Sequence, residues 1–132
     1  MAEKSPLPRL GHMTLAIERI REVTAAMNLA SFEQDWRSRL IVERCLQIIS
    51  EPSRSLPNDL KSRHAHIPWP RIAAIGNRLR HEYDDILPDI LWTIVSDNIS
   101  ALEQVCKEEF APEQRREARR QQARETTRRH RP

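Results

Sequence analysis

The sequence predicts an all-α protein: an antiparallel bundle of four main helices with a short connecting turn and an arginine-rich C-terminal tail. Glycine accounts for only 2 of the 132 residues, too few for the tight turns of a many-stranded β-sandwich or barrel. Apolar residues recur at steps of three and four along most of the chain, which is the period of an amphipathic helix. With 39% hydrophobic residues, a chain of this length makes one domain with a single core.

The first helix is predicted over residues 12–28, after an irregular lead-in, with an apolar face made of Met13, Ala16, Ile17, Ile20, Val23 and Met27. The second is predicted to open with a capping box, in which the Ser31 hydroxyl accepts from the Gln34 amide and the Gln34 side chain reaches back. It should end before Pro52, because proline lacks the N–H group of a helix interior. Its wide apolar face predicts a central position: Trp36, Leu40, Ile41, Cys45, Leu46, Ile48 and Ile49.

The second half of the chain continues this pattern. A short helical turn is predicted around residues 57–63, inside a proline-rich connection. The third main helix is predicted over residues 71–83, with Pro70 as its first residue, where the missing N–H leaves no helical bond unmade. The fourth is predicted to start near Pro88 and to bury Leu91, Ile94, Val95, Leu102, Val105 and Cys106. These elements place the helical domain at residues 1–110.

The net charge of +3 comes from the C-terminal tail. Residues 1–110 carry 14 Lys and Arg against 16 Asp and Glu, whereas residues 111–132 carry 8 Arg against 3 Glu. The tail has almost no apolar face, so it is predicted to be a flexible, solvated segment that is helical at most by propensity. Its arginines either hold RNA electrostatically or only keep the end of the chain soluble.

Several classes of protein are excluded. No stretch approaches the roughly 20 apolar residues of a membrane span, and the N-terminus lacks a secretory signal. We therefore expect a cytoplasmic protein with no membrane contact, in which Cys45 and Cys106 are buried, reduced thiols. Glycine-rich phosphate loops, nucleophile elbows and zinc motifs are absent from the sequence. His64 and His66 are interpreted as loop histidines rather than metal ligands, so we expect no metal and no cofactor.

The predicted helix over residues 71–83 has two chemically different faces on a helical wheel. The inner face holds Ile72, Gly76, Leu79 and Tyr83, and the outer face holds Ala74, Asn77, His81 and Asp84. Arg78 flanks the outer face, and Arg80 lies closer to the core side. Asn77 and His81 are four residues apart, so their side chains are neighbours.

The outer face supplies the groups that phosphodiester cleavage without a metal requires. An imidazole such as that of His81 can take the proton from a ribose 2′-hydroxyl, and guanidinium groups stabilise the charge that grows on the phosphate. Asn77 would orient the imidazole or bind a phosphate oxygen. One histidine per chain cannot act as both base and acid, so a two-fold dimer with these helices face to face would complete the site. The alternative is a face that is polar only because water covers it.

The chain resembles the HepT-like ribonuclease family of the HEPN superfamily over about residues 10–110. The resemblance rests on short segments in the family's order, among them Leu10-Gly-His-Met13, Arg44-Cys-Leu-Gln-Ile-Ile49, Ile67-Pro-Trp69 and Gly76-Asn-Arg-Leu-Arg-His-Glu-Tyr83. It implies a helical homodimer that cleaves RNA without a metal in a cleft between its subunits. It also implies a toxin whose partner is an MntA-like nucleotidyltransferase antitoxin, which adds AMP to a tyrosine of the toxin.

The family motif is Arg, four to six residues, His, any residue, Tyr. On the resemblance, His81 is the catalytic imidazole, Tyr83 is the site of AMP addition, and Asn77 matches the Asn that commonly follows the Arg. The three positions allowed for the Arg hold no arginine: Ala74, Ile75 and Gly76. Arg78 is the preferred substitute, with Arg80 as a second phosphate-binding cation. A glycine on the inner face would also let another helix approach closely.

Three functions follow from these observations. The leading hypothesis is a metal-independent endoribonuclease toxin of a prokaryotic two-gene, type VII-like pair. The alternative is a non-catalytic module of the same family that binds RNA or a nucleotide, or that scaffolds a nucleotidyltransferase complex. The third is a helical dimerisation domain whose polar face has no chemical role.

Overall fold

The computed structural model describes residues 5–82 and 87–130. Within these ranges the chain forms six α-helices and no strand: α1 (Leu7–Thr24), α2 (Leu29–Gln34), α3 (Trp36–Arg54), α4 (Asn58–Arg63), α5 (Trp69–Glu82) and α6 (Pro88–Arg129). The helices α1, α3, α5 and α6 are the four main helices that the sequence predicts, and α4 is the predicted connecting turn. The all-α bundle is therefore confirmed, with α2 as a short helix that was not predicted.

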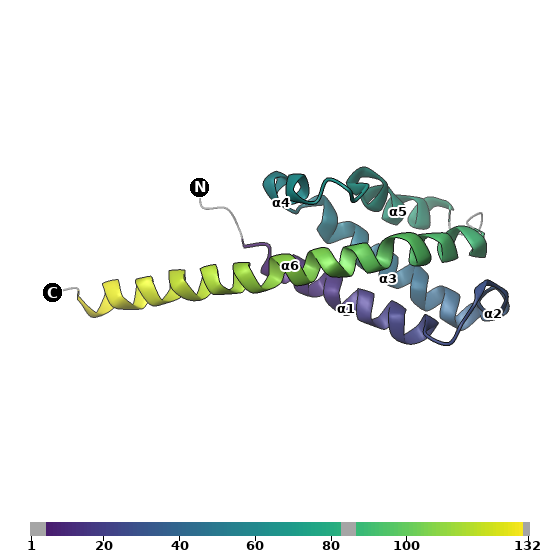
Figure 1. Cartoon of the computed structure of the whole chain (residues 1–132), viewed down its shortest axis with the longest axis horizontal. Helices are drawn as coiled ribbons and strands as arrows, with labels where there is room; N and C mark the ends of the chain where they lie inside the picture. The colour runs from purple at the N-terminus through teal and green to yellow at the C-terminus, as the bar shows by residue number, and fades with distance from the viewer. Residues whose placement is uncertain (1–4, 83–86, 131–132) are drawn as a thin grey trace.

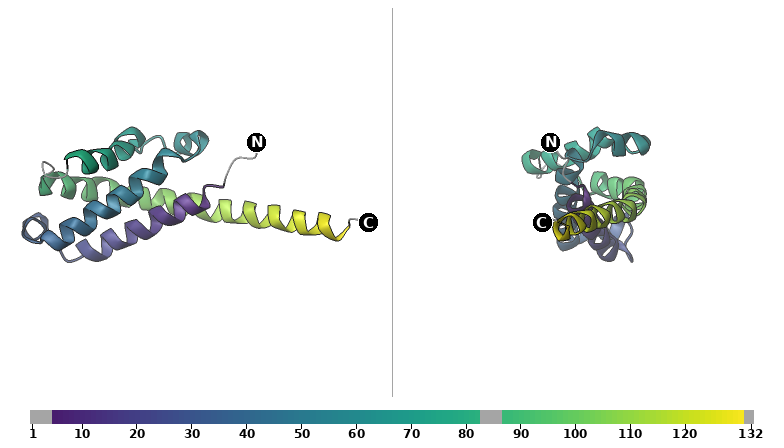
Figure 2. Two further views of the ribbon diagram at one scale, coloured as in Figure 1. Left: turned by 180° about the vertical axis from the view of Figure 1, so that it is seen from behind. Right: turned by 90° about the vertical axis from the view of Figure 1, so that its left-hand side faces the viewer.

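Helix α3 lies at the centre of the bundle, as its wide apolar face predicted. It packs against α1 on one side and α5 on the other, and α6 packs mainly along α1 (Figure 1). The view from behind in Figure 2 shows α1 and α3 side by side. The core lies between these helices and contains Leu10, Met13, Ile17, Ile20, Val42, Ile49, Ile72, Leu79, Leu91 and Leu102. Burial of each such side chain contributes roughly 1.5–3 kcal/mol before the entropy of folding is counted.

Helix α1 lies closer to the N-terminus than the predicted range of 12–28. Pro8 falls in its first turn, where a missing N–H leaves no helical bond unmade, so the lead-in prolines start the helix instead of preceding it. The helix ends at Thr24, and Asn28 is extended with φ −120° and ψ 178°. Asn28 therefore begins the next helix and does not end the first.

The predicted capping box at Ser31 and Gln34 is wrong. The N-cap of α2 is Asn28, whose Oδ1 accepts from the Ser31 backbone N–H at 2.9 Å while the Asn28 N–H donates to the Ser31 Oγ at 3.0 Å. A separate cap starts α3, where Asp35 accepts from the backbone N–H and the hydroxyl of Ser38. These bonds hold the pKa of the Asp35 carboxyl below its ordinary value. Two short-range caps therefore divide the predicted single helix into α2 and α3.

Two further details of α3 differ from expectation. Pro52 does not end the helix, which continues to Arg54; only the last turn lies beyond it, and the Ser53 hydroxyl donates to the Ser50 carbonyl at 2.6 Å. The apolar side chains of the first turns are not core, because three of them are 43–59% exposed: Trp36, Leu40 and Ile41. The inward stripe instead holds Ser38, Val42, Cys45, Leu46 and Ile49.

Helices α5 and α6 begin close to the predicted positions. Helix α5 starts at Trp69, one residue before Pro70, and the Trp69 indole N–H donates to the carbonyls of Lys61 and His64. Pro88 occupies the first turn of α6, as predicted. Residues 111–129 continue α6 as helix beyond the bundle (Figure 1), and the flexibility of this segment stays a prediction.

The two cysteines have the environment that the sequence predicts. Cys45 and Cys106 are buried and form no disulfide, and burial raises the pKa of both thiols. None of the helices in the described ranges combines the length and the apolar character that crossing a membrane requires.

Candidate active site on helix α5

The wheel prediction for α5 agrees with the structure at each described position. Ile72 and Leu79 are 2% exposed and Gly76 is buried. The polar side chains on the other side are exposed: Asn77, Arg78, Arg80 and His81. Tyr83 lies outside the described residues. The periodicity is confirmed because helical geometry alone fixes which side chains share a face.

Gly76 marks the closest approach of α5 to α3. A Cβ at this position would lie 2.5 Å from the Ser50 Oγ. The Gly76 N–H donates to that hydroxyl at 3.1 Å, and the hydroxyl in turn donates to the Ala73 carbonyl at 2.7 Å. The predicted close helix approach is therefore confirmed, and no arginine side chain fits at residue 76 beside Ser50.

The other two motif positions differ from each other. Ile75 is 6% exposed and belongs to the core, whereas Ala74 is exposed on the same side as His81. Of the three positions that the family motif allows, only residue 74 could therefore carry a guanidinium toward the imidazole. Because that residue is alanine, any cation beside His81 must come from elsewhere.

Arg78 and Arg80 lie on opposite sides of the His81 face. Arg80 lines a groove of about 340 Å³ between α1, α3 and α5, together with His12, Arg44, Gln47, Ile48, Glu51, Pro52 and Gly76. Arg78 lines a groove of about 430 Å³ between α5 and α6, together with Arg71, Ala74, Ile75, Asp89, Ile90, Thr93 and Ile94. The two candidate phosphate-binding arginines therefore face different surfaces of the subunit.

The imidazole of His81 stands on a convex surface between these grooves. It lines neither of them, and within residues 5–82 and 87–130 no hydrogen bond or ion pair is made by His81 or by Asn77. A single subunit thus presents the catalytic candidate without a cleft around it.

Sequence reasoning missed two basic residues of the groove beside α5. His12 comes from α1 and Arg44 from α3, and only packing brings them next to Arg80. A signal was present for Arg44, since it lies one turn after the exposed Leu40 on the outer face of α3. No signal joined His12 to this surface, because its partners are remote in sequence.

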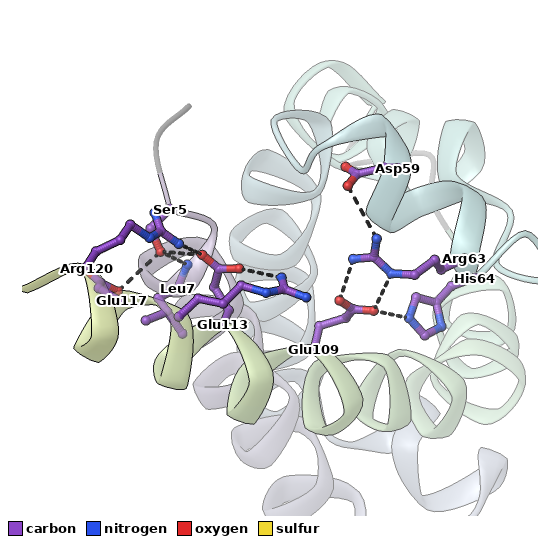
Figure 3. Close-up of polar contacts among 10 residues, drawn as sticks. Ser5, Leu7, Asp59, Arg63, His64, Glu109, Glu113, Glu117 and Arg120 are labelled. Atoms are coloured by element: carbon purple, nitrogen blue, oxygen red, sulfur yellow. Dashed lines mark hydrogen bonds and ion pairs between the residues drawn. The ribbon is translucent and has the colours of Figure 1, made fainter. Parts of the chain in front are cut away.

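The interpretation of His64 as a loop histidine is wrong. It caps the C-terminus of α4, is 6% exposed, and its Nε2 lies 2.7 Å from the Glu109 Oε2 (Figure 3). Arg63 donates two hydrogen bonds to the same carboxylate, at 2.7 and 3.2 Å. These bonds, chiefly those from Arg63, lower the pKa of Glu109. His66 is exposed, and the described residues contain no group of three side chains placed to hold a metal ion.

Comparison with known proteins gives a consistent set of relatives. A family model described as HepT-like, ribonuclease HepT-like, matches residues 13–109. A protein of Thermococcus cleftensis named as a ribonuclease HepT is 37% identical over 87 residues, which cover 66% of this chain and 79% of that protein. A protein of Caldanaerobacter subterraneus subsp. tengcongensis named as an RNase is 30% identical over 105 residues, covering 80% and 94% of the two chains.

A more distant relative supports the same grouping. A protein of Methanocaldococcus jannaschii named as an RNase is 29% identical over 93 residues, which cover 67% of this chain and 77% of that protein. No solved structure gives a significant match.

Proposed function

Because the chain belongs to the HepT-like ribonuclease family, we propose that it is a metal-independent endoribonuclease in which His81 transfers the proton. The observation that carries the proposal is the outer face of α5. There, an exposed imidazole, an amide and two guanidinium groups lie within two helical turns: Asn77, Arg78, Arg80 and His81. These are the groups that cleavage of a phosphodiester by its own 2′-hydroxyl requires.

The proposed reaction uses each of these groups once. Neutral His81 takes the proton of the 2′-hydroxyl, and the oxygen attacks the adjacent phosphorus. The bond from phosphorus to the 5′ oxygen breaks and that oxygen takes up a proton, leaving a 2′,3′-cyclic phosphate and a 5′-hydroxyl. Arg78, with Arg80 as the second cation, stabilises the charge on the phosphate oxygens. Asn77, one turn before His81, orients the imidazole or binds a phosphate oxygen.

A homodimer would supply what one subunit lacks. His81 lies on a convex surface outside both neighbouring grooves, and a base alone cannot also protonate the leaving oxygen. A two-fold axis beside α5 would place a second imidazole and a second set of arginines across a shared cleft. The composite cleft is therefore part of the proposal.

The direct test is cleavage of a long single-stranded RNA in EDTA. We expect His81→Ala to lose about 10²- to 10⁴-fold in rate, as is typical when an acid–base group is removed. His66→Ala, which removes another exposed imidazole, should cleave like the wild type. Cleavage by His81→Ala at the wild-type rate would show that His81 is not the acid–base group.

The family resemblance extends the proposal to a toxin–antitoxin pair. In this part of the proposal, an MntA-like nucleotidyltransferase antitoxin neutralises the ribonuclease by adding AMP to Tyr83. Co-expression with such an enzyme, followed by intact-mass measurement, should show addition of AMP to the wild type and none to Tyr83→Phe. Equal modification of both proteins would place the AMP on another residue.

Gly76 favours a second candidate, the non-catalytic module that binds RNA or a nucleotide or scaffolds a nucleotidyltransferase complex. The glycine excludes the motif arginine from its place beside Ser50. This candidate predicts that the unmodified wild-type dimer binds RNA without cleaving it, and that Arg78→Glu abolishes the binding. RNA cleavage that depends on His81 would eliminate it.

A further inference from the structure

The C-terminal part of α6 projects from the bundle as a single exposed helix. Residues 114–129, here called the arm, are all exposed, and they extend away from the other five helices (Figures 1 and 2). The family model ends at residue 109, so the arm lies outside the part of the chain that defines the family. Its role must be inferred from its own residues.

The composition of the arm excludes two kinds of contact. It holds 7 arginines and 2 glutamates, and alanine is its largest apolar residue. A protein-docking helix needs buried aromatic or aliphatic anchors, and a helix that lies on a membrane needs an apolar face. The arm has neither, whereas guanidinium groups are sufficient to bind phosphates.

The root of the arm is fixed by a buried carboxylate. Glu113 is 7% exposed and accepts from Arg116 at 3.0 Å and from Arg120 at 2.9 Å (Figure 3). The Ser5 hydroxyl lies 3.5 Å from the Glu113 carboxylate and 3.3 Å from that of Glu117. Two of the seven arginines are thus neutralised locally, and they hold the arm to the N-terminal segment.

The other five arginines of the arm have no ion pair or hydrogen bond with any described side chain: Arg115, Arg119, Arg124, Arg128 and Arg129. At about 100° per residue, Arg115 and Arg119 lie close together on one side of the helix, and Arg124 and Arg128 lie on the opposite side. Positive charge therefore surrounds the helix. This distribution fits a ligand that contacts it on more than one side, such as a folded RNA strand.

We propose that the arm is a second RNA-binding element, in which the unpaired arginines hold the phosphodiester backbone away from His81. The ligand class rests on the proposed ribonuclease function, but the binding does not depend on cleavage. An isolated helix without packing is only marginally stable in water, so neutralisation by phosphates should also order the arm. Binding there would raise the affinity for long RNA without changing the chemical step.

The test compares two double variants that remove the same formal charge. Both are made in the His81→Ala background, so that no RNA is lost, and binding of a labelled structured RNA in EDTA is followed by fluorescence anisotropy. Arg115→Gln/Arg119→Gln removes unpaired cations, and Arg116→Gln/Arg120→Gln removes the cations that Glu113 neutralises. Far-ultraviolet circular dichroism checks that both variants keep the helical content of the parent.

We expect Arg115→Gln/Arg119→Gln to lower the slope of log affinity against log salt by about 1.4, at about 0.7 per phosphate contact on a single strand. Because the electrostatic gain vanishes near 1 M salt, this slope change is roughly a 25-fold loss of affinity at 0.1 M. The Arg116→Gln/Arg120→Gln variant should retain most of the affinity. Equal losses in the two variants, or no loss in either, would overturn the proposal.

Cleavage assays separate this proposal from the proposed function. With His81 present, the Arg115→Gln/Arg119→Gln variant should cleave a short oligonucleotide at the wild-type rate and require more of a long RNA for half-maximal rate. Absence of cleavage with arm-dependent binding would refute the ribonuclease and retain the arm. Tight binding of the arm to an acidic polypeptide in preference to RNA would assign it to a protein partner and overturn the proposal.

Discussion

At residue 76 the absence of a side chain allows α5 to contact α3. We predict that Gly76→Ala destabilises the fold by about 1–3 kcal/mol, the typical effect of overpacking, because the new Cβ would lie 2.5 Å from the Ser50 Oγ. The better helix propensity of alanine, worth about 1 kcal/mol, offsets only part of this. Urea unfolding followed by circular dichroism measures the difference.

The other glycine of the chain provides the matched control. Gly11 also lies inside a helix, but a Cβ there would meet nothing within 4 Å. Gly11→Ala should therefore be neutral or stabilising by up to about 1 kcal/mol. If both alanine variants had the same stability, the contact with Ser50 would not explain the glycine.

Glu109 makes a second residue-scale prediction, which concerns pH. Arg63 and His64 hold the pKa of its carboxyl below the ordinary value of 4.5. The stabilisation is therefore fully present above about pH 4.5 and is lost as the pH falls through the lower pKa of the folded state. Glu109→Gln should lower the free energy of unfolding at neutral pH by about 1–3 kcal/mol and flatten its decline in acid.

Glu108 distinguishes this effect from general charge removal. Its carboxylate is 51% exposed and lies 3.7 Å from the His64 Nδ1, so Glu108→Gln should change stability by less than about 0.5 kcal/mol. Unfolding measured from pH 3 to pH 7 compares the two variants. A steep decline in acid that persists in Glu109→Gln would assign the pH dependence to another group.

At the scale of elements, the cap of α2 decides where the second helix begins. Asn28→Ala removes the side chain that accepts from the Ser31 N–H and should cost about 1 kcal/mol. Gln34→Ala should be neutral, since Gln34 is exposed and is not part of the cap. Thermal unfolding of the two variants measures this, and a larger loss for Gln34→Ala would restore the box expected from sequence.

The elements that sequence predicts well are those fixed by local geometry. The two faces of α5 follow from helical periodicity, and Pro88 starts α6 because proline suits a first turn. The misplaced cap has a local cause as well, because Asn28 and Ser31 are both good capping residues and their spacing does not say which one ends the chain's extended segment. The exposure of Trp36 depends instead on which helices lie opposite it, and the sequence of α3 does not contain that information.

At the scale of the whole molecule, long-range contacts account for most of what the sequence could not predict. His64 appears to be a loop residue until α6 brings Glu109 to it, and His12 joins Arg80 only after α1, α3 and α5 have packed. The candidate site shows the same division. Its residues follow from one helix and from a family resemblance, whereas the grooves on either side of α5, and the convex surface between them, follow from packing alone.

The convex surface around His81 makes the final prediction, that catalysis requires two subunits. His81→Ala and Arg78→Gln should each form inactive homodimers, with a mass near twice the 15.5 kDa of one chain. In a cleft that combines His81 of one subunit with Arg78 of the other, a mixed dimer of these variants keeps one intact pair. Mixing the two proteins under conditions that exchange subunits should therefore restore RNA cleavage, measured against each protein alone and against a wild-type dimer carried through the same exchange. If each subunit used its own His81 and Arg78, both sites of the mixed dimer would be incomplete and no activity would return.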